Sequence, residues 1–149
     1  SRWLFQSEFS KCISSAKTYF WNMNVEDNGF MILETLDNKT AFLHVSCTEW
    51  KNLFSMEIYG ITGKIKIDGL GGSYGTETLT YYKMLPEMGI PKIQEWSYDE
   101  EDKSWETEIN EFYNEILNDK DPTVNLNDAI ETLKIVEKIY IDNNYDYSS

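Results

Sequence analysis

The chain has 149 residues, of which 41% are hydrophobic and 15% aromatic, and its formal net charge at pH 7 is −13. This length suits one domain with a real core, and the aromatic content excludes a disordered chain. The acidic balance argues against nucleic acid and anionic membrane surfaces as partners, because both are bound through Lys and Arg. No apolar run approaches the roughly 20 residues that span a bilayer.

The two cysteines, Cys12 and Cys47, are far apart and lack Cys-x-x-Cys spacing. We expect buried free thiols in a reducing cytoplasm, with a disulfide as the alternative. The apolar run after Arg2 is too short for the core of a signal peptide. The first residue is Ser1 rather than Met, which favours a chain cut from something longer or a processed tag.

Residues 11–98 are predicted to be rich in β-strands, because alternating or β-favouring stretches recur between turn formers. Asp37 and Asn38 separate two such stretches directly, which predicts a hairpin. The expected strands span residues 11–21, 29–36, 39–50, 53–60, 64–68, 77–84 and 92–98, the last as a short edge strand.

From Ser104 onward the apolar residues change to helical spacing. Ser104 suits the N-cap position of this helix, Asp121-Pro122 closes the segment, and Trp105 is expected in the core. A second helix is predicted from about Asn127, and its apolar stripe comprises Ala129, Leu133, Val136 and Tyr140.

This order of strands and then helices predicts an α+β fold. We expect one domain over residues 1–149, with an open, mostly antiparallel β-sheet and helices packed on one face as a two-layer sandwich. The β-rich part is expected over 11–98 and the helical part over 104–142.

The glycine-rich stretch from Gly69 to Gly75 has the composition of a phosphate-binding loop. A dinucleotide fingerprint needs Gly-x-Gly-x-x-Gly after a strand and at the start of a helix. Tyr74 stands where the third glycine would fall, and the residues from Thr76 onward are β-branched and aromatic. We therefore interpret the stretch as a connection between two strands that binds no dinucleotide.

Other catalytic patterns are weak in this sequence. His44 is the only histidine, and Cys47 follows it by three residues, which places the two on opposite faces of a strand. A nucleophile–base pair or a metal site is therefore not expected. Glu49 and Glu57 could form the carboxylate pair of a small glycoside hydrolase, although 26 acidic residues make such pairs common.

Two tryptophans, Trp21 and Trp50, end predicted strands, where a side chain either packs in the core or lines a cleft. The run Glu49–Asn52 supplies a carboxylate, an aromatic ring, an ammonium and an amide in four consecutive residues. Such a set suits a polyhydroxylated ligand.

Several ordered motifs resemble the C-terminal domain of the glucose–fructose oxidoreductase, inositol dehydrogenase and rhizopine catabolism (Gfo/Idh/MocA) family. The similarity covers roughly residues 25 to 141. The stretches that carry it are Val25–Asn28, Glu49–Asn52, Glu57–Gly63 (similar to the family's Glu-x-x-Gly-x-x-Gly), Trp105–Phe112 and Asp128-Ala129.

This resemblance implies an open, mostly antiparallel sheet whose helix-free face packs against another subunit, so that a homo-oligomer is expected. It also implies a parent enzyme that binds NAD or NADP on an N-terminal Rossmann domain absent from this chain. The substrates would be sugars, sugar nucleotides, inositols or related polyols, oxidised or reduced by hydride transfer.

The family's catalytic residues have no counterpart in this sequence. There is no Glu-Lys-Pro tripeptide, and His44 does not complete Asp-x-x-x-His, because Thr40 stands four residues before it. We therefore expect no catalytic, cofactor-binding or metal-binding residue in this chain and no activity of the chain alone.

Carried over by position, the resemblance assigns substrate-proximal roles to Glu49, Trp50, Lys51 and Asn52, and a weaker one to Tyr74. The function expected is therefore the substrate-wall and subunit-interface domain of a cytoplasmic NAD(P)-dependent sugar oxidoreductase. The alternatives are a standalone α+β module that binds a carbohydrate or a protein, and the small hydrolase.

Overall fold

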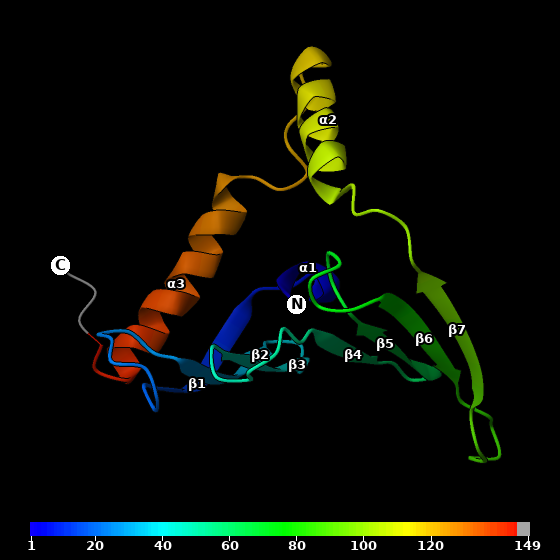
Figure 1. Cartoon of the computed structure of the whole chain (residues 1–149), viewed down its shortest axis with the longest axis horizontal. Coiled ribbons are helices and arrows are strands. Elements are labelled where there is room, and N and C mark those ends of the chain that lie inside the picture. Colours follow the sequence, from blue (N-terminus) through cyan, green and yellow to red (C-terminus); the bar gives the residue numbers. More distant parts are fainter. Residues whose placement is uncertain (146–149) are drawn as a thin grey trace. The chain divides into compact units, whose positions relative to one another are not determined.

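The computed structural model describes residues 1–145, which form seven strands and three helices (Figure 1). The elements are α1 (Arg2–Phe5), β1 (Phe9–Lys17), β2 (Asn28–Thr35), β3 (Thr40–Ser46), β4 (Ser55–Tyr59), β5 (Gly63–Asp68), β6 (Glu77–Lys83), β7 (Lys92–Tyr98), α2 (Ser104–Leu117) and α3 (Leu126–Asp142). They belong to two compact units. The first contains Ser1–Trp50 and the chain from Pro122 onward, and the second contains Lys51–Asp121.

The first unit is built on an antiparallel sheet of three strands in the order β1-β2-β3. β2 and β3 form the predicted hairpin, in which Asn38 adopts a left-handed conformation (φ 62°) that asparagine tolerates well. α3 packs against β1. The core between them is small and consists of Ala16, Leu33 and Ile139, which expose 2%, 4% and 8% of their surface.

The other face of this sheet is apolar and open. In the strand register Ile13 pairs with Ile32, and Ile32 pairs with Phe42, so the three side chains form one row across the sheet. They expose 51%, 37% and 70% of their surface. We call this row, together with Phe30 in the next row, the open face of the first unit.

The second unit contains an antiparallel sheet in the order β4-β5-β6-β7, with β7 at one edge as predicted. One face carries an apolar row in which Met56, Ile67, Leu79 and Trp96 are paired across the strands. The opposite face is polar: the Lys64 ammonium lies 3.1 Å from the Glu57 carboxylate and over the ring of Tyr82.

The helix of the second unit differs from the sequence prediction. No residue of α2 is buried, and Trp105, expected in the core, exposes 76% of its surface. Ser104 is the first helical residue rather than the N-cap, which is Lys103, and the Ser104 N–H donates to the Asp102 carboxylate at 2.9 Å. The helix ends at Leu117, ahead of the expected stop at Asp121-Pro122.

In α3 the packed face is rotated from the predicted stripe. Ile139 is buried and Ile135 half-buried, whereas the expected core residues Leu133 and Val136 expose 63% and 40% of their surface. The helix begins with a capping box between Asn125 and Asp128 and ends near Asn143 as predicted.

The predicted α+β class and the antiparallel pairing are confirmed, although the strands form two sheets rather than one. Within the described residues, no helix combines the length and apolar character needed to cross a membrane.

Candidate functional site

A buried carboxylate organises the loop between β1 and β2. Asp27 exposes 2% of its surface, and its two oxygens accept the backbone N–H groups of Tyr19, Phe20 and Trp21 at 2.9, 2.7 and 3.0 Å. The Asn28 side-chain amide donates to the same carboxylate at 3.1 Å. Burial alone raises the pKa of Asp27, but these four donors outweigh it and hold the pKa well below its ordinary value.

This carboxylate explains why β1 ends at Lys17 instead of continuing to Trp21 as predicted. The N–H groups of residues 19–21 all point to Asp27, so they are not available for a strand ladder. Asp27 is tied into the sheet by its own backbone, which bonds to Lys17 and Cys47.

Two aromatic side chains of this loop, Phe20 and Trp21, are exposed and lie beside Trp50 in the segment that follows β3. The Phe20 ring lies 5.0 Å from Trp21 and 4.9 Å from Trp50 between centroids and is nearly perpendicular to both indoles. The two indoles are 6.1 Å apart. Phe20, Trp21 and Trp50 expose 62%, 45% and 69% of their surface, and we call these three residues the aromatic platform.

Trp50 lies in an unusual backbone conformation. Its φ is 57°, in the left-handed region that bulky residues rarely adopt. Such strain persists only where surrounding contacts enforce it, and it is concentrated at functional sites. β3 ends at Ser46, four residues before the predicted end at Trp50, so this residue belongs to a loop.

A polar network supports the segment between β3 and Trp50. The Asn28 amide donates to the Thr48 hydroxyl at 2.9 Å, and its oxygen lies 3.3 Å from His44 Nε2. His44 also stacks on Phe30 and places Nδ1 3.9 Å from the Glu49 carboxylate. His44 therefore links the sheet to Glu49.

The predicted substrate-proximal residues are divided between the two units. Glu49 and Trp50 lie in the first unit, beside Phe20 and Trp21, whereas Lys51 and Asn52 begin the second unit and Tyr74 lies on its glycine loop. Phe20 was not predicted from the sequence. The signal available for it was the run of aromatic residues 19–21 ahead of an acid at the start of a strand.

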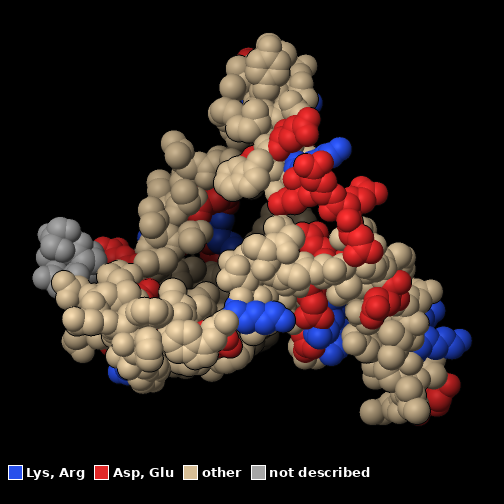
Figure 2. All heavy atoms as spheres, in the orientation of Figure 1, with Lys and Arg blue, Asp and Glu red and all other residues tan. Residues whose placement is uncertain are grey.

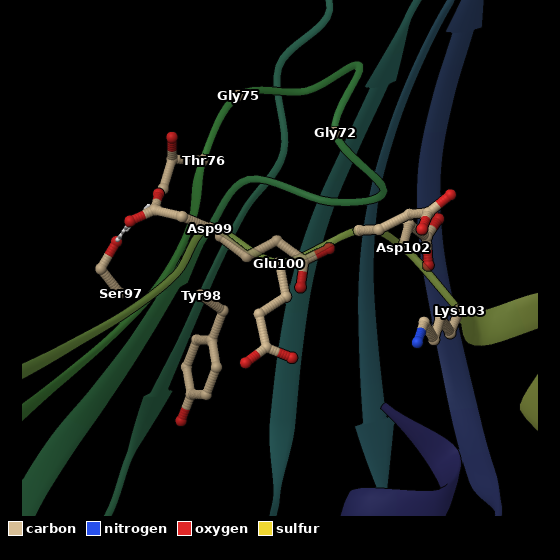
Figure 3. A pocket seen from close by; sticks show the side chains of 11 residues that line it. Gly72, Gly75, Thr76, Ser97, Tyr98, Asp99, Glu100, Asp102 and Lys103 are labelled. Atoms are coloured by element: carbon tan, nitrogen blue, oxygen red, sulfur yellow. Dashed lines mark hydrogen bonds between the residues drawn. The ribbon is translucent and has the colours of Figure 1, made fainter.

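The glycine loop of the second unit joins β5 to β6, as predicted. It borders a cavity of about 380 Å³ at the end of the sheet (Figure 3). The acidic residues that line this cavity are Glu77, Asp99, Glu100, Glu101 and Asp102. Acidic side chains also dominate the surface between β7 and α2 in Figure 2.

The loop does not fit a dinucleotide phosphate. The Gly71 N–H donates to the Glu77 carboxylate at 2.6 Å, and the N–H groups of Ser73 and Tyr74 donate to loop carbonyls. A strand, β6, follows the loop, so no helix N-terminus is directed at the cavity. The surrounding carboxylates also repel a phosphate.

The remaining candidate chemistries are limited. Among residues 1–145, no group of three or more His, Cys, Asp or Glu side chains could hold a metal ion. Both cysteines are free thiols, but the expectation that they are buried is wrong: Cys12 is half-buried and Cys47 is exposed. Glu57 bonds to Lys64 and Tyr59, and these bonds lower its pKa, so it is a poor proton donor for glycoside hydrolysis.

Comparison with known proteins gives a likeness of structure. No protein-family model and no curated relative matches the sequence. The chain is similar to the UDP-N-acetylglucosamine 3-dehydrogenase of Acidithiobacillus ferrooxidans, with a TM-score of 0.75 and 15% identity over 95% of this chain and 44% of that one. It is also similar to a protein assigned as an NADPH-dependent oxidoreductase from Desulfitobacterium hafniense, with a TM-score of 0.74 and 14% identity over 95% of this chain and 43% of that one.

These identities show a shared fold, and the chain spans less than half the length of either protein. The resemblance to part of a longer oxidoreductase, predicted from the sequence, is thereby confirmed at the level of the fold. The chain has the α+β fold of a region found in these oxidoreductases.

Proposed function

We propose that this chain is the C-terminal domain of an NAD(P)-dependent oxidoreductase of the Gfo/Idh/MocA type that acts on a sugar, sugar nucleotide or polyol. The observation that carries the proposal is the likeness, over 95% of the chain, to two oxidoreductases. One of them is named for a sugar nucleotide, which supports this substrate class.

In this proposal the chain contributes walls of the substrate pocket. Glu49 can accept hydrogen bonds from substrate hydroxyls, and Trp50 offers a ring for stacking. Lys51, Asn52 and Tyr74 are proposed as further substrate contacts. NAD or NADP supplies the hydride acceptor or donor, and it is held outside the described residues, since the glycine loop does not fit its phosphates. The chain alone is therefore inactive.

The open face of the first unit is the proposed contact with a second copy of the chain. Ile13, Ile32 and Phe42 form a continuous apolar row that no element of the first unit covers in the described residues. Exposed apolar rows of this kind mark association surfaces. We place the assembly in the cytoplasm, in keeping with two free thiols.

The test is an assay of the full-length protein with NAD⁺ or NADP⁺ and a panel of UDP-N-acetylglucosamine, hexoses and inositols. Reduced nicotinamide should form with at least one member of the panel, and the isolated chain should give none. Absence of turnover with every compound and both cofactors would overturn the oxidoreductase assignment.

The exposed aromatic platform favours a second candidate, a carbohydrate-binding module without catalysis. This candidate predicts that the full-length protein binds a sugar in calorimetry but binds neither NADH nor NADPH. Tight binding of either cofactor to the full-length protein would exclude it.

A further inference from the structure

Two features of the first unit point to the aromatic platform as a built binding surface. The first is its exposure: three adjacent aromatic side chains each leave between 45% and 69% of their surface open. Contiguous exposed apolar groups of this kind mark ligand or partner sites. The second is the strained backbone of Trp50, which turns the indole toward Phe20 and away from a strand position.

The loop that carries the other two rings is fixed at both ends. Asp27 holds the backbone of Phe20 and Trp21, and the Trp21 indole N–H donates to the Cys47 carbonyl at 3.2 Å. At its start, the Thr18 hydroxyl bonds to the Val25 carbonyl at 2.7 Å and lies 3.0 Å from the Tyr145 hydroxyl. The rings are thus held in place before any ligand arrives, which lowers the entropic cost of binding.

We propose that the aromatic platform binds a pyranose ring whose apolar face stacks on the Trp50 indole, while the Trp21 indole, tilted 59° from it, contacts the edge of the sugar and Glu49 accepts a hydroxyl hydrogen bond. This inference rests on the proposed function and extends it, because it adds the loop of Phe20 and Trp21 to the substrate site. It also makes Asp27 a positioning residue, which acts on the ligand only through that loop.

The charged groups near the aromatic platform favour an uncharged sugar ring over the diphosphate-bearing part of a sugar nucleotide as its ligand. Glu49 precedes Trp50 in the chain, and no lysine or arginine of the described residues makes a cation–π contact with the three rings. The Glu49 carboxylate, which lies 3.9 Å from His44 Nδ1, can accept hydroxyl donors and repels a diphosphate. The Trp21 N–H is already bonded to the Cys47 carbonyl, so this indole offers its ring rather than a donor.

The test compares variants of the full-length protein in steady-state kinetics with its sugar substrate. We expect the loss of one aromatic contact with the sugar to weaken binding about tenfold, near the low end of what stacking of a base on an aromatic ring contributes. Trp50→Ala and Trp21→Ala should therefore raise KM about tenfold with kcat within about twofold. Trp50→Phe should keep most of the affinity, because it keeps a stackable ring.

Trp3→Ala is the matched control, since Trp3 lies in the same unit and exposes 71% of its surface without joining the platform. Its KM should not change. If KM is unchanged in Trp50→Ala and Trp21→Ala while the enzyme still oxidises its sugar, the platform proposal fails and the proposed function stands. Should Trp50→Ala not fold, an unchanged KM in Trp21→Ala overturns the platform proposal in the same way.

A direct titration separates the remaining outcomes. Tryptophan fluorescence of the full-length protein should respond to N-acetylglucosamine. The response should be lost in the double variant that combines Trp50→Phe with Trp21→Ala, and it should be kept in Trp3→Ala. A response to UDP and none to N-acetylglucosamine would assign the platform to the base and overturn the sugar assignment. This titration needs no turnover, so it tests the platform even if the proposed function fails.

Discussion

The β1–β2 loop and the glycine loop are both held by a carboxylate that accepts backbone hydrogen bonds, but the two carboxylates differ in burial. In both, a carboxylate accepts backbone N–H groups: Asp27 accepts three in the buried interior of the first unit, and Glu77 accepts one on the exposed surface of the second. The first loop carries the exposed aromatic platform, and the second borders an acidic cavity. The glycine content made the second loop the more conspicuous in the sequence. The buried carboxylate, with its larger number of backbone hydrogen bonds, indicates that the first loop has the more rigid backbone.

The largest expected effect is the loss of Asp27. Asp27→Ala leaves three backbone N–H groups and the Asn28 amide without their acceptor in a buried site, which is strongly unfavourable. We expect the melting temperature to fall by roughly 10 °C or more. Thermal unfolding followed by circular dichroism measures this. A fall as small as that of an ordinary surface substitution would show that Asp27 does not organise the loop.

The same residue predicts a dependence on pH. The pKa of Asp27 is below its ordinary value of 3.8 in the folded protein, so the folded state favours the charged carboxylate. Its stabilising contribution is therefore complete above pH 3.8 and is lost as the pH falls below that value toward the folded pKa. The difference in melting temperature between the parent and Asp27→Asn should accordingly be constant near neutral pH and shrink in acid. A difference that grew in acid would contradict the assignment.

The next largest effect is the loss of unfolding free energy when a glycine of the second loop is replaced by alanine. Gly69 has φ +79°, and a Cβ there would lie 2.4 Å from the Thr76 carbonyl oxygen, whereas a Cβ on Gly72 (φ +70°) would meet nothing within 4 Å. Gly69→Ala should cost about 3 kcal/mol in unfolding free energy and Gly72→Ala about 1 kcal/mol. Denaturant titration of both variants measures the difference. Equal costs would mean that the loop relaxes around the added methyl group.

These contrasts also mark what sequence could and could not predict. The hairpin at Asp37 and Asn38 follows from local turn chemistry, so it was predictable. The end of β1 was not, because it depends on a carboxylate at position 27 that reaches back to the backbone of residues 19–21. In the sequence, Asp27 looks like an ordinary turn former.

Helix α2 shows a second limit. Its apolar spacing predicts a buried face, yet Trp105 exposes 76% of its surface. Periodicity establishes that one face is apolar and gives no information about which partner covers it. At the candidate site, Glu49 and Trp50 were singled out by their residue types, and the resemblance added their substrate-proximal roles. Phe20 required the structure, because its proximity to Trp50 arises from packing between two loops.

An intermediate effect on assembly is expected from the open face. Phe42 exposes 70% of its surface in the apolar row with Ile13 and Ile32. If this row joins two copies, Phe42→Asp should weaken self-association by about tenfold or more, because it places a charge in an apolar contact. Sedimentation of the full-length protein over a concentration series measures the change. Thr132→Asp, an exposed position on α3, which packs on the other face of the sheet, is the control and should leave association unchanged.

The smallest effect on the free energy of unfolding is expected for Glu77→Gln, the counterpart in the glycine loop of Asp27→Asn. Glu77→Gln keeps an oxygen that can accept the Gly71 N–H in an exposed hydrogen bond. Its unfolding free energy should therefore change by no more than about 0.5 kcal/mol. Asp27→Asn instead places an amide donor against a set of backbone donors, because both oxygens of Asp27 already accept hydrogen bonds. Parallel denaturant titrations of the two variants should show a clearly larger loss for Asp27→Asn. Equal losses in unfolding free energy would mean that burial of the carboxylate makes no difference between the two loops. In that case Asp27 would not hold the backbone of the aromatic platform in place before a ligand binds.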